Sequence, residues 1–414
     1  MKSRAVVCGG GLMGLSIAYH LAKRGASVML FERECVGSHS GSRVSTGLMT
    51  ASGFYSDTTS QLFARRSLEM YTKLAQRGKF RFNKCGRVYF GSSSASSIQL
   101  RRLLTRLKCT NANPELVDSQ NEMHSRWPMF SSEDLKLAVY SPDDVALDVH
   151  GLCRELVEEV QELGVEIHEN CGIKKVLLSD SSSVYAVDTD KGLVETSAFV
   201  NAAGIWSNMI PVKEVPEGFV RIPVHPCSYM FLSTTKLPQD HIADSTPVFI
   251  DCDNGTFISL TIPEHNLVCD WQVPAPNWDN FYSVLKRLNE RCPSLGQLPH
   301  GDLISGAEMY TPDQFPVMGE SWQARGYYIA NGMNGNGLAM AGGLAQTLAE
   351  WILEGRPSVN VGKYDVIRFL PLHTNAQYLY ERVPEVASNT FKTLHHSFQC
   401  HTARNLRMSQ STTS

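Results

Sequence analysis

The chain has 414 residues, of which 43% are hydrophobic and 19% charged, and its formal net charge is −3. This length suffices for two or three lobes, and the composition excludes a largely disordered chain. The small negative charge provides no basic surface for nucleic acid or an anionic membrane, so we expect neither as a partner. The 11 cysteines contain no CxxC pair, which is typical of reduced thiols and predicts no metal site.

The first thirty residues predict a strand, a glycine turn, a helix and a second strand. The strand at 5–8 leads into Gly9, Gly11 and Gly14, which match the pattern G-x-G-x-x-G. Glycines let the backbone approach a pyrophosphate, and the N-terminus of the following helix offers free N–H groups to it. Glu32 ends the second strand, where a carboxylate can bind ribose hydroxyls. This unit predicts a dinucleotide site and leaves FAD and NAD both open.

Two later segments repeat the α/β pattern. One begins near Asp144 and continues through an amphipathic helix and several strands to about residue 204. The other, "GYYIANGMNGNGLAMAGG", is again a strand, a glycine-rich turn and a helix. Residues 220–300 between them alternate as antiparallel strands do. A nucleotide lobe in three pieces favours a flavoprotein over an NAD dehydrogenase, which usually keeps its dinucleotide fold in one block.

Four ordered motifs resemble the glycine-oxidase and D-amino-acid-oxidase superfamily. They are the opening unit, "FVNAAGIWS", "YTPDQFPVMGE" and "GYYIANGMNGNGLAMAGGLAQTLAEWI". Within this superfamily the chain is similar to the dimethylglycine and sarcosine dehydrogenase branch over residues 4–387. The resemblance implies a two-lobed FAD-binding fold that oxidises the C–N bond of small N-methylated amino acids.

We therefore expect an α/β protein, an α+β two-lobed flavoprotein with a Rossmann-type FAD-binding lobe and an inserted antiparallel β-sheet substrate lobe. The expected divisions are 1–50, 141–219 and 301–362 for the FAD-binding lobe, 51–140 and 220–300 for the substrate or cap lobe, 363–387 for a C-terminal extension of the family, and 388–414 for a disordered tail.

The resemblance also implies which residues contact FAD. For the ADP half they are Gly9, Gly11, Gly14 and Glu32, with Ile173 at the adenine and Ala203 and Gly204 on the other side of the dinucleotide. For the flavin they are Gly332, Met333, Asn334, Gly337 and Leu338. Further expected contacts are Arg33, Ser42, Arg43, Gly47 and Leu48. A helix that begins near Gly337 and faces the pyrimidine edge of the flavin would stabilise negative charge there.

The stretch "SRVSTGL" departs from the active dehydrogenases of this branch. Those enzymes carry tryptophan and histidine where Arg43 and Val44 stand, and that histidine bonds covalently to the flavin. Valine cannot form the bond, so the resemblance implies non-covalent FAD. Arginine followed by an apolar residue is similar to the pyruvate dehydrogenase phosphatase regulatory subunits of the family, as are "RIPVHPCSYMFL" and "STPVFIDCDNG".

Candidate catalytic side chains lie on the predicted strand "HPCSYMFLS". Alternation places His225, Tyr229 and Phe231 on one face, and relatives tend to carry tyrosine where Phe231 stands. His225 could act as an acid or a base, although a lone histidine in a strand is more often structural.

An amine oxidase also needs a group that holds the substrate carboxylate. Arginine is the usual clamp, because its planar fork makes two parallel hydrogen bonds. Arg43, Arg221 and Arg87 are the candidates, and no spacing chooses among them.

Two functions stay open. The first is an FAD-binding protein most like the regulatory subunit of pyruvate dehydrogenase phosphatase, with a phosphatase catalytic subunit as partner. The second is an active FAD-dependent oxidoreductase of a small amine such as dimethylglycine or sarcosine. A folate-linked dehydrogenase is a weaker third, because relatives append a folate-binding module where this chain has a polar tail. The resemblance implies the mitochondrial matrix, yet "MKSR" shows no transit peptide, so a truncated or spliced form is also expected.

Overall fold

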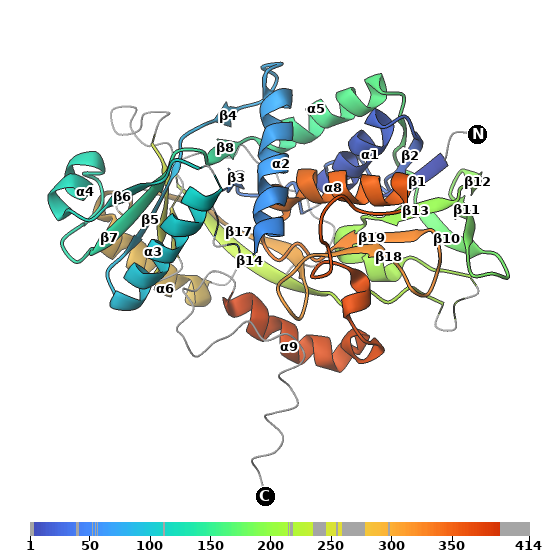
Figure 1. Ribbon diagram of the computed structural model, residues 1–414. Coiled ribbons are helices and arrows are strands. Elements are labelled where there is room, and N and C mark those ends of the chain that lie inside the picture. The colour runs from blue at the N-terminus through green and yellow to red at the C-terminus, as the bar shows by residue number, and fades with distance from the viewer. Residues whose placement is uncertain are drawn as a thin grey trace, which may run out of the picture.

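The structure of the chain is a computed structural model. It describes residues 4–38, 41–51, 53, 55, 57–110, 112–213, 215, 218–234, 246–253, 256–258, 278–296 and 299–389. Figure 1 shows a sheet with helices α1, α5 and α8 at one end of the molecule and a second sheet with α3, α4 and α6 at the other. The long strands β14 and β17 run between these two ends.

The first lobe is built on a six-stranded sheet in the order β18-β19-β13-β1-β2-β9. Its strands are β1 (Arg4–Cys8), β2 (Ser27–Phe31), β9 (Glu166–His168), β13 (Ala198–Asn201), β18 (Val317–Glu320) and β19 (Tyr327–Asn331). Neighbouring strands are parallel except for β18 with β19. The central strands are apolar and almost fully buried, because helices cover one face of the sheet and a layer that includes Val176, Val184 and Val187 packs on the other. The expected Rossmann-type lobe is confirmed.

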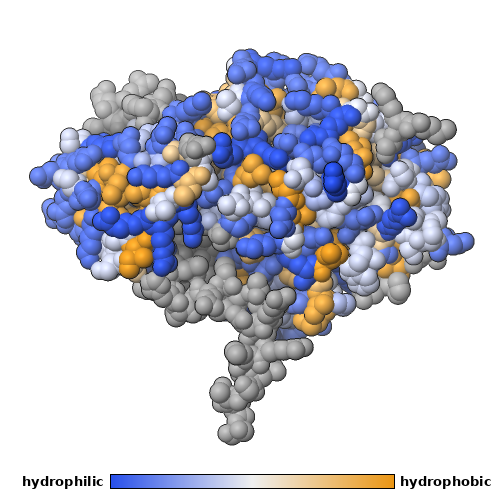
Figure 2. All heavy atoms as spheres, in the orientation of Figure 1, coloured by the Kyte–Doolittle hydropathy of each residue, from blue (hydrophilic) through white to orange (hydrophobic). Residues whose placement is uncertain are grey.

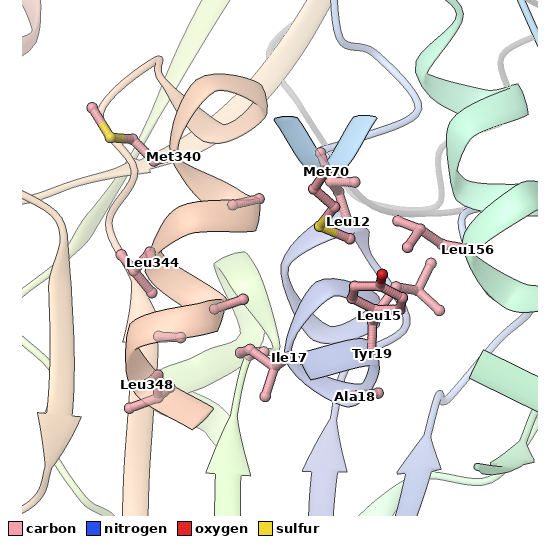
Figure 3. Close-up of a cluster of buried hydrophobic side chains, with 14 of the residues drawn as sticks. Leu12, Leu15, Ile17, Ala18, Tyr19, Met70, Leu156, Met340, Leu344 and Leu348 are labelled. Atoms are coloured by element: carbon pink, nitrogen blue, oxygen red, sulfur yellow. The ribbon is translucent and has the colours of Figure 1, made fainter. Parts of the chain in front are cut away.

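Helix α1 (Leu12–Lys23) lies at the centre of this lobe, with α8 (Gly337–Glu354) on one side and α5 (Val149–Glu162) on the other. Figure 3 shows Leu15 and Ile17 of α1 in the same apolar cluster as Leu344 and Leu348 of α8. Each of these side chains is fully buried. Burial of one such side chain stabilises the fold by about 1.5–3 kcal/mol, so these helices are firmly fixed on the sheet.

Glycines in α8 allow α2 (Thr58–Ala75) to approach closely. A Cβ built on Gly343 would lie 2.3 Å from the carbonyl oxygen of Phe63. The Gly343 N–H also donates to Ser67 Oγ at 2.9 Å. The small residues of "AMAGGLAQ" therefore serve helix packing in the middle of α8, while the first turn of the same helix lies at the candidate site.

The second lobe has a five-stranded sheet in the order β16-β15-β5-β7-β6. Its strands are β5 (Arg87–Gly91), β6 (Glu115–Val117), β7 (Leu137–Ser141), β15 (Val248–Asp251) and β16 (Thr256–Ile258), and its helices are α3 (Ser94–Cys109), α4 (Gln120–Arg126), α6 (Trp278–Arg291) and α7 (Pro293–Gly296). An aromatic cluster that includes Phe90, Phe130 and Phe249 packs on this sheet. The sheet is antiparallel, as expected, except that β15 pairs with β5 in parallel.

The remaining elements join the two lobes or lie at their rims. They are the pair β14 (His225–Thr234) and β17 (His300–Tyr310), the sheet of β10 (Ile173–Leu178), β11 (Val184–Thr189) and β12 (Gly192–Glu195), the sheet of β3 (Leu48–Met49), β8 (Val145–Leu147) and β4 (Phe82–Asn83), the 3₁₀ helices η1 (Gly204–Met209), η3 (Val366–Arg368) and η4 (Pro371–Thr374), and helix α9 (Ala376–Asn389).

The lobe limits stay a prediction, and three elements pack differently from that division. Helix α2 lies within the range expected for the cap, yet it packs on α8. Strand β17 begins at His300, the last residue expected for the cap, and continues to Tyr310 within the range expected for the FAD-binding lobe, yet it pairs with β14 along this length. Helix α9 continues to Asn389, two residues into the segment expected to be disordered, and residues 390–414 lie outside the described part of the chain.

The face of the molecule in Figure 2 is mainly hydrophilic, and its hydrophobic residues lie in separate areas. Across the residues that the structure describes, every helix is too short or too polar to cross a membrane.

We predict that Gly343→Ala lowers the free energy of unfolding by about 1–3 kcal/mol, because the new methyl group must push α2 away from α8. Chemical denaturation measures this change. Glu354→Ala, at an exposed position of the same helix, is the matched control and should change stability by less than about 0.5 kcal/mol. Equal effects of the two substitutions would contradict the tight contact.

Candidate functional site

Four adjacent parallel strands of the six-stranded sheet end at the same edge, and a predicted contact follows each end. These contacts are Gly9 after β1, Glu32 after β2, Ala203 after β13 and Gly332 after β19. All except Gly332 are partly accessible to solvent. Ligands of open α/β sheets bind at this carboxyl edge, so residues that lie far apart in the sequence form one candidate site.

The turn between β1 and α1 has no room for side chains at two of its glycines. A Cβ on Gly14 would lie 1.9 Å from the carbonyl oxygen of Gly9, and a Cβ on Gly9 would lie 2.5 Å from that of Ala202. Gly9 also has a φ of +112°, a conformation that favours glycine. Helix α1 begins after Gly11, which offers no capping side chain. Its first N–H groups therefore face the sheet edge, where they can bind an anion.

Glu32 fastens the turn to the end of β2. Its carboxylate accepts hydrogen bonds from the N–H groups of Gly10, at 2.7 Å, and of Glu34, at 3.0 Å. The Cys171 N–H donates to the carbonyl oxygen of Glu32 at 2.9 Å. This bond holds the segment before Ile173 beside Glu32, so the structure brings these two predicted contacts together.

Arg33 and Trp206 form a contact that the sequence did not indicate. The guanidinium carbon of Arg33 lies 5.0 Å from the centroid of the Trp206 ring. Trp206 lies in η1, the 3₁₀ helix that begins at Gly204. In the sequence, only the position of Trp206 two residues after the "NAAG" motif could have indicated that it lies at this site.

Residues 41–50 connect the dinucleotide turn with β14. Ser42 Oγ accepts a hydrogen bond from the Leu12 N–H at the start of α1, at 3.0 Å. The buried Val44 uses its carbonyl oxygen to accept one from the Tyr229 hydroxyl of β14, at 2.8 Å. Leu48 then pairs with Ala146 of β8. This segment therefore lies between the expected ADP half and the expected flavin half of the site.

Two further predicted residues shape the same segment. The Arg43 guanidinium donates to the carbonyl oxygen of Ser38 at 2.8 Å. Gly47 has a φ of +71° and lies so close to β8 that a Cβ would be 2.3 Å from the carbonyl oxygen of Leu147. Gly47 is thus explained by backbone packing, whether or not it contacts a cofactor.

The loop before α8 is held by Asn334. Its side-chain oxygen accepts a hydrogen bond from the Thr311 N–H at 2.9 Å, and its side-chain nitrogen donates to the carbonyl oxygen of Gly332. Both Gly332 and Asn334 have positive φ, at +65° and +54°. Helix α8 begins at Gly337, as predicted.

The N-terminus of α8 is contacted by Glu308 of β17, a residue that the sequence analysis missed. The Glu308 carboxylate accepts hydrogen bonds from the N–H groups of Gly335 and Gly337. Burial raises the pKa of Glu308 to about 7, although these two bonds favour its charged form. Glu308 looked like an ordinary strand residue, because the spacing along the chain gives no sign of its contact with residues 335–337.

The three candidate catalytic residues of β14 lie in two different places. The rings of Tyr229 and Phe231 stack with centroids 6.3 Å apart. His225 instead contacts Tyr380 of α9 edge-on, at 6.0 Å, and burial lowers its pKa, so it is neutral at pH 7. Tyr229 and Phe231 therefore lie toward Val44, whereas His225 lies against α9. This contact favours the structural role for His225.

The candidate arginine clamps Arg87 and Arg221 also lie in different environments. Arg87 is buried in an ion pair with Asp144, with Nε 2.8 Å from the carboxylate oxygen. Arg221 is exposed, and its guanidinium lies 5.7 Å from the ring centroid of Phe219. The buried pair disfavours Arg87 as a clamp, because breaking it would leave Asp144 charged and unpaired.

The arrangement fits a dinucleotide cofactor in which one half is an adenine nucleotide and the other half carries a reactive ring. The glycine turn, the start of α1 and Glu32 suit a pyrophosphate and a ribose. The segment of Val44, the loop at Asn334 and the face of Tyr229 lie together where a flavin ring would follow. The chain belongs to the family of FAD-dependent oxidoreductases, because the profile of that family matches residues 4–351. FAD is accordingly its cofactor, and the predicted family is confirmed.

A second profile, the FAD-dependent oxidoreductase central domain, matches residues 354–409. The chain is 30% identical to the mitochondrial pyruvate dehydrogenase phosphatase regulatory subunit of Mus musculus, over 99% of this chain and 48% of that protein. It is 26% identical to the mitochondrial sarcosine dehydrogenase of Mus musculus, over 98% of this chain and 46% of that enzyme. The chain thus spans about half the length of these relatives.

A solved structure shares the fold. The L-proline dehydrogenase from P. horikoshii is 25% identical and superposes with a TM-score of 0.78, over 89% of this chain and 98% of that chain. The expected two-lobed flavoprotein fold is confirmed. The individual FAD contacts named above stay predictions.

We predict that Tyr229→Phe loosens residues 41–50, because it removes the hydrogen bond to the Val44 carbonyl. Amide hydrogen exchange should be faster in this segment, and the free energy of unfolding should fall by about 1 kcal/mol. Tyr185→Phe, on the exposed face of β11, is the control and should change neither value. Unchanged exchange in residues 41–50 would show that the bond does not hold the segment.

Proposed function

We propose that the chain binds FAD non-covalently and has a regulatory role of the kind named for its relative, the pyruvate dehydrogenase phosphatase regulatory subunit. Val44 carries this proposal. It stands where the resemblance places the histidine that bonds to flavin, and its side chain is apolar and buried. A site without that covalent bond can still hold FAD through the glycine turn, Glu32 and the loop before α8.

The proposed FAD orientation follows from the strand ends. The ADP half lies across Gly9, Glu32 and Ala203, with the pyrophosphate at the start of α1. The flavin half lies between Val44 and the loop that Asn334 holds. When bound, FAD supplies a two-electron acceptor; the residues of this chain bind it, orient it and exclude water from it.

A protein partner is supported by apolar side chains near the C-terminal end of the described chain. Ile367, Leu370, Leu372 and Tyr380 are each 55–65% exposed. Neighbouring exposed apolar residues of this kind are typical of protein contact sites. A phosphatase catalytic subunit is the partner we propose. The names of the two mouse relatives include the word mitochondrial, which supports a mitochondrial location for this chain. Within the mitochondrion, the matrix is the compartment we propose.

The second candidate is an active oxidoreductase of a small N-methylated amino acid. The stacked pair Tyr229 and Phe231 supports it, because an aromatic wall on one side of a flavin suits a methylated amine. The relative named sarcosine dehydrogenase supports the same substrate class.

We predict that acid precipitation of the purified protein releases all of its flavin into the supernatant, because Val44 offers no atom that bonds to the ring. Absorbance at flavin wavelengths in the pellet and the supernatant measures the release. Flavin that stays with the washed pellet would contradict the proposal. In the variant Val44→His, retained flavin would support the placement of residue 44 against the ring.

We predict that an anaerobic flavin spectrum of the protein stays unchanged when dimethylglycine or sarcosine is added. Bleaching of the flavin by either amine would establish the second candidate.

We also predict that the protein co-purifies with the phosphatase catalytic subunit. In a matched variant, Ile367→Asp with Leu370→Asp should reduce the co-purification and leave the FAD content unchanged. Equal recovery of the phosphatase with this variant would exclude these residues as the contact.

A further inference from the structure

Glu308 shares one face of the β14–β17 pair with the candidate aromatic residues. In the antiparallel register Glu308 lies opposite Cys227, and Gly306 lies opposite Tyr229. Directly opposed residues of antiparallel strands point to the same side. A Cβ on Gly306 would lie 2.6 Å from the Tyr229 ring, so this ring packs against the neighbouring strand at Gly306. Glu308 and the Tyr229 hydroxyl, which contacts Val44, therefore belong to one surface.

In the part of the chain that the structure describes, Glu308 is held by backbone groups. Within the described ranges, no lysine, arginine or histidine forms an ion pair with Glu308; its hydrogen bonds come from the backbone of Gly335 and Gly337. Most other carboxylates enclosed in this fold are paired, as Asp144 is with Arg87 and Asp313 with Arg368. Glu308 is only partly accessible to solvent. A partly buried carboxylate that lacks a counter-ion is costly, and a ligand with a positive charge would lower that cost.

We propose that Glu308 is a specificity-determining residue that binds the positively charged nitrogen of a small amine ligand on the face of Tyr229. This inference rests on the proposed FAD site, and it applies equally to a regulatory ligand and to a substrate. Glu308 and the Tyr229 face supply a negative charge and an aromatic surface, the two features that recognise a methylated ammonium group. A neutral ligand of the same shape would leave the carboxylate unpaired, so the site selects by charge.

The other titratable groups of this face come from three elements, and His225 of β14 is one of them; burial lowers its pKa, so it is neutral at pH 7. From β17 comes Tyr310, from β14 come Cys227 and Tyr229, and from α9 comes Tyr378. Burial raises the pKa of Cys227 to about 11 and raises those of Tyr310 and Tyr378 above the ordinary value of tyrosine. The start of α8 adds N–H groups without a titratable side chain. Glu308 is neutral below about pH 7 and charged above it, so binding of a cation should strengthen as the pH rises through 7.

Two probes of nearly equal shape test this inference. Trimethylglycine carries a permanent positive charge that does not titrate, and 3,3-dimethylbutanoate replaces its nitrogen by carbon. Both have the same carboxylate, so contacts with an arginine cancel in the comparison. Calorimetric titration of the purified full chain at pH 6 and pH 8 gives the dissociation constant of each probe for wild type, Glu308→Gln and Asp302→Asn. Asp302 lies near the other end of β17 and is exposed, so Asp302→Asn removes an equal charge away from the face.

We expect wild type and Asp302→Asn at pH 8 to bind trimethylglycine at least about tenfold more tightly than 3,3-dimethylbutanoate. This preference should shrink at pH 6 and be lost in Glu308→Gln at both values. A preference that survives in Glu308→Gln, or failure of wild type to bind the cation, would overturn the proposal. Absorbance of the same samples gives the FAD content. A chain without FAD would refute the proposed function, and the calorimetric ratio would still decide the role of Glu308.

Discussion

The candidate site depends on the close approach of helix α1 to the turn that follows β1. Gly14 lies so near the Gly9 carbonyl that any side chain at this position would collide with it. This approach brings the first N–H groups of α1 to the edge where the parallel strands end. Ser42 then binds the start of the helix, and Glu32 binds the N–H group of Gly10. Without the approach, the segment 41–50 would lose its attachment to the dinucleotide turn, and the expected pyrophosphate would lose the N–H groups that favour its charge.

A second constraint acts at the other end of the site, where the first turn of α8 meets β17. The loop before α8 has two residues with positive φ, and Asn334 fixes it to Thr311. The resulting N-terminus of α8 contacts the carboxylate of Glu308, so the positive end of the helix dipole is shared between a side chain of this protein and the expected flavin edge. The segment 41–50 joins the two ends, because Ser42 contacts α1 while the Val44 carbonyl contacts Tyr229. A change at any one of these contacts should therefore affect both halves of the cofactor site.

Local features of the site could be predicted from the sequence, and long-range ones could not. The G-x-G-x-x-G turn, Glu32 and the start of α8 at Gly337 follow from glycine spacing and helix periodicity, which are properties of one short segment. The parallel pairing of β15 with β5, the packing of α2 on α8 and the contact of Arg33 with Trp206 join segments that no local pattern connects. Glu308 was missed for the same reason: its partners lie 27 and 29 residues later, in a loop whose backbone N–H groups have no signature in the sequence.

The central claim is that the strand-end site holds FAD through both of its halves without a covalent bond. An equilibrium titration tests it most directly: the protein is freed of flavin under mild denaturing conditions, refolded, and titrated with FAD or with FMN while flavin fluorescence is followed. FMN carries the same ring but lacks the adenosine that Glu32 and the segment at Ile173 are expected to contact. The account predicts one FAD per chain and binding of FAD at least about a hundredfold tighter than binding of FMN, since several hydrogen bonds of about 1 kcal/mol each are lost with the adenosine. Equal affinity for the two flavins, or no saturable binding of FAD, would contradict it.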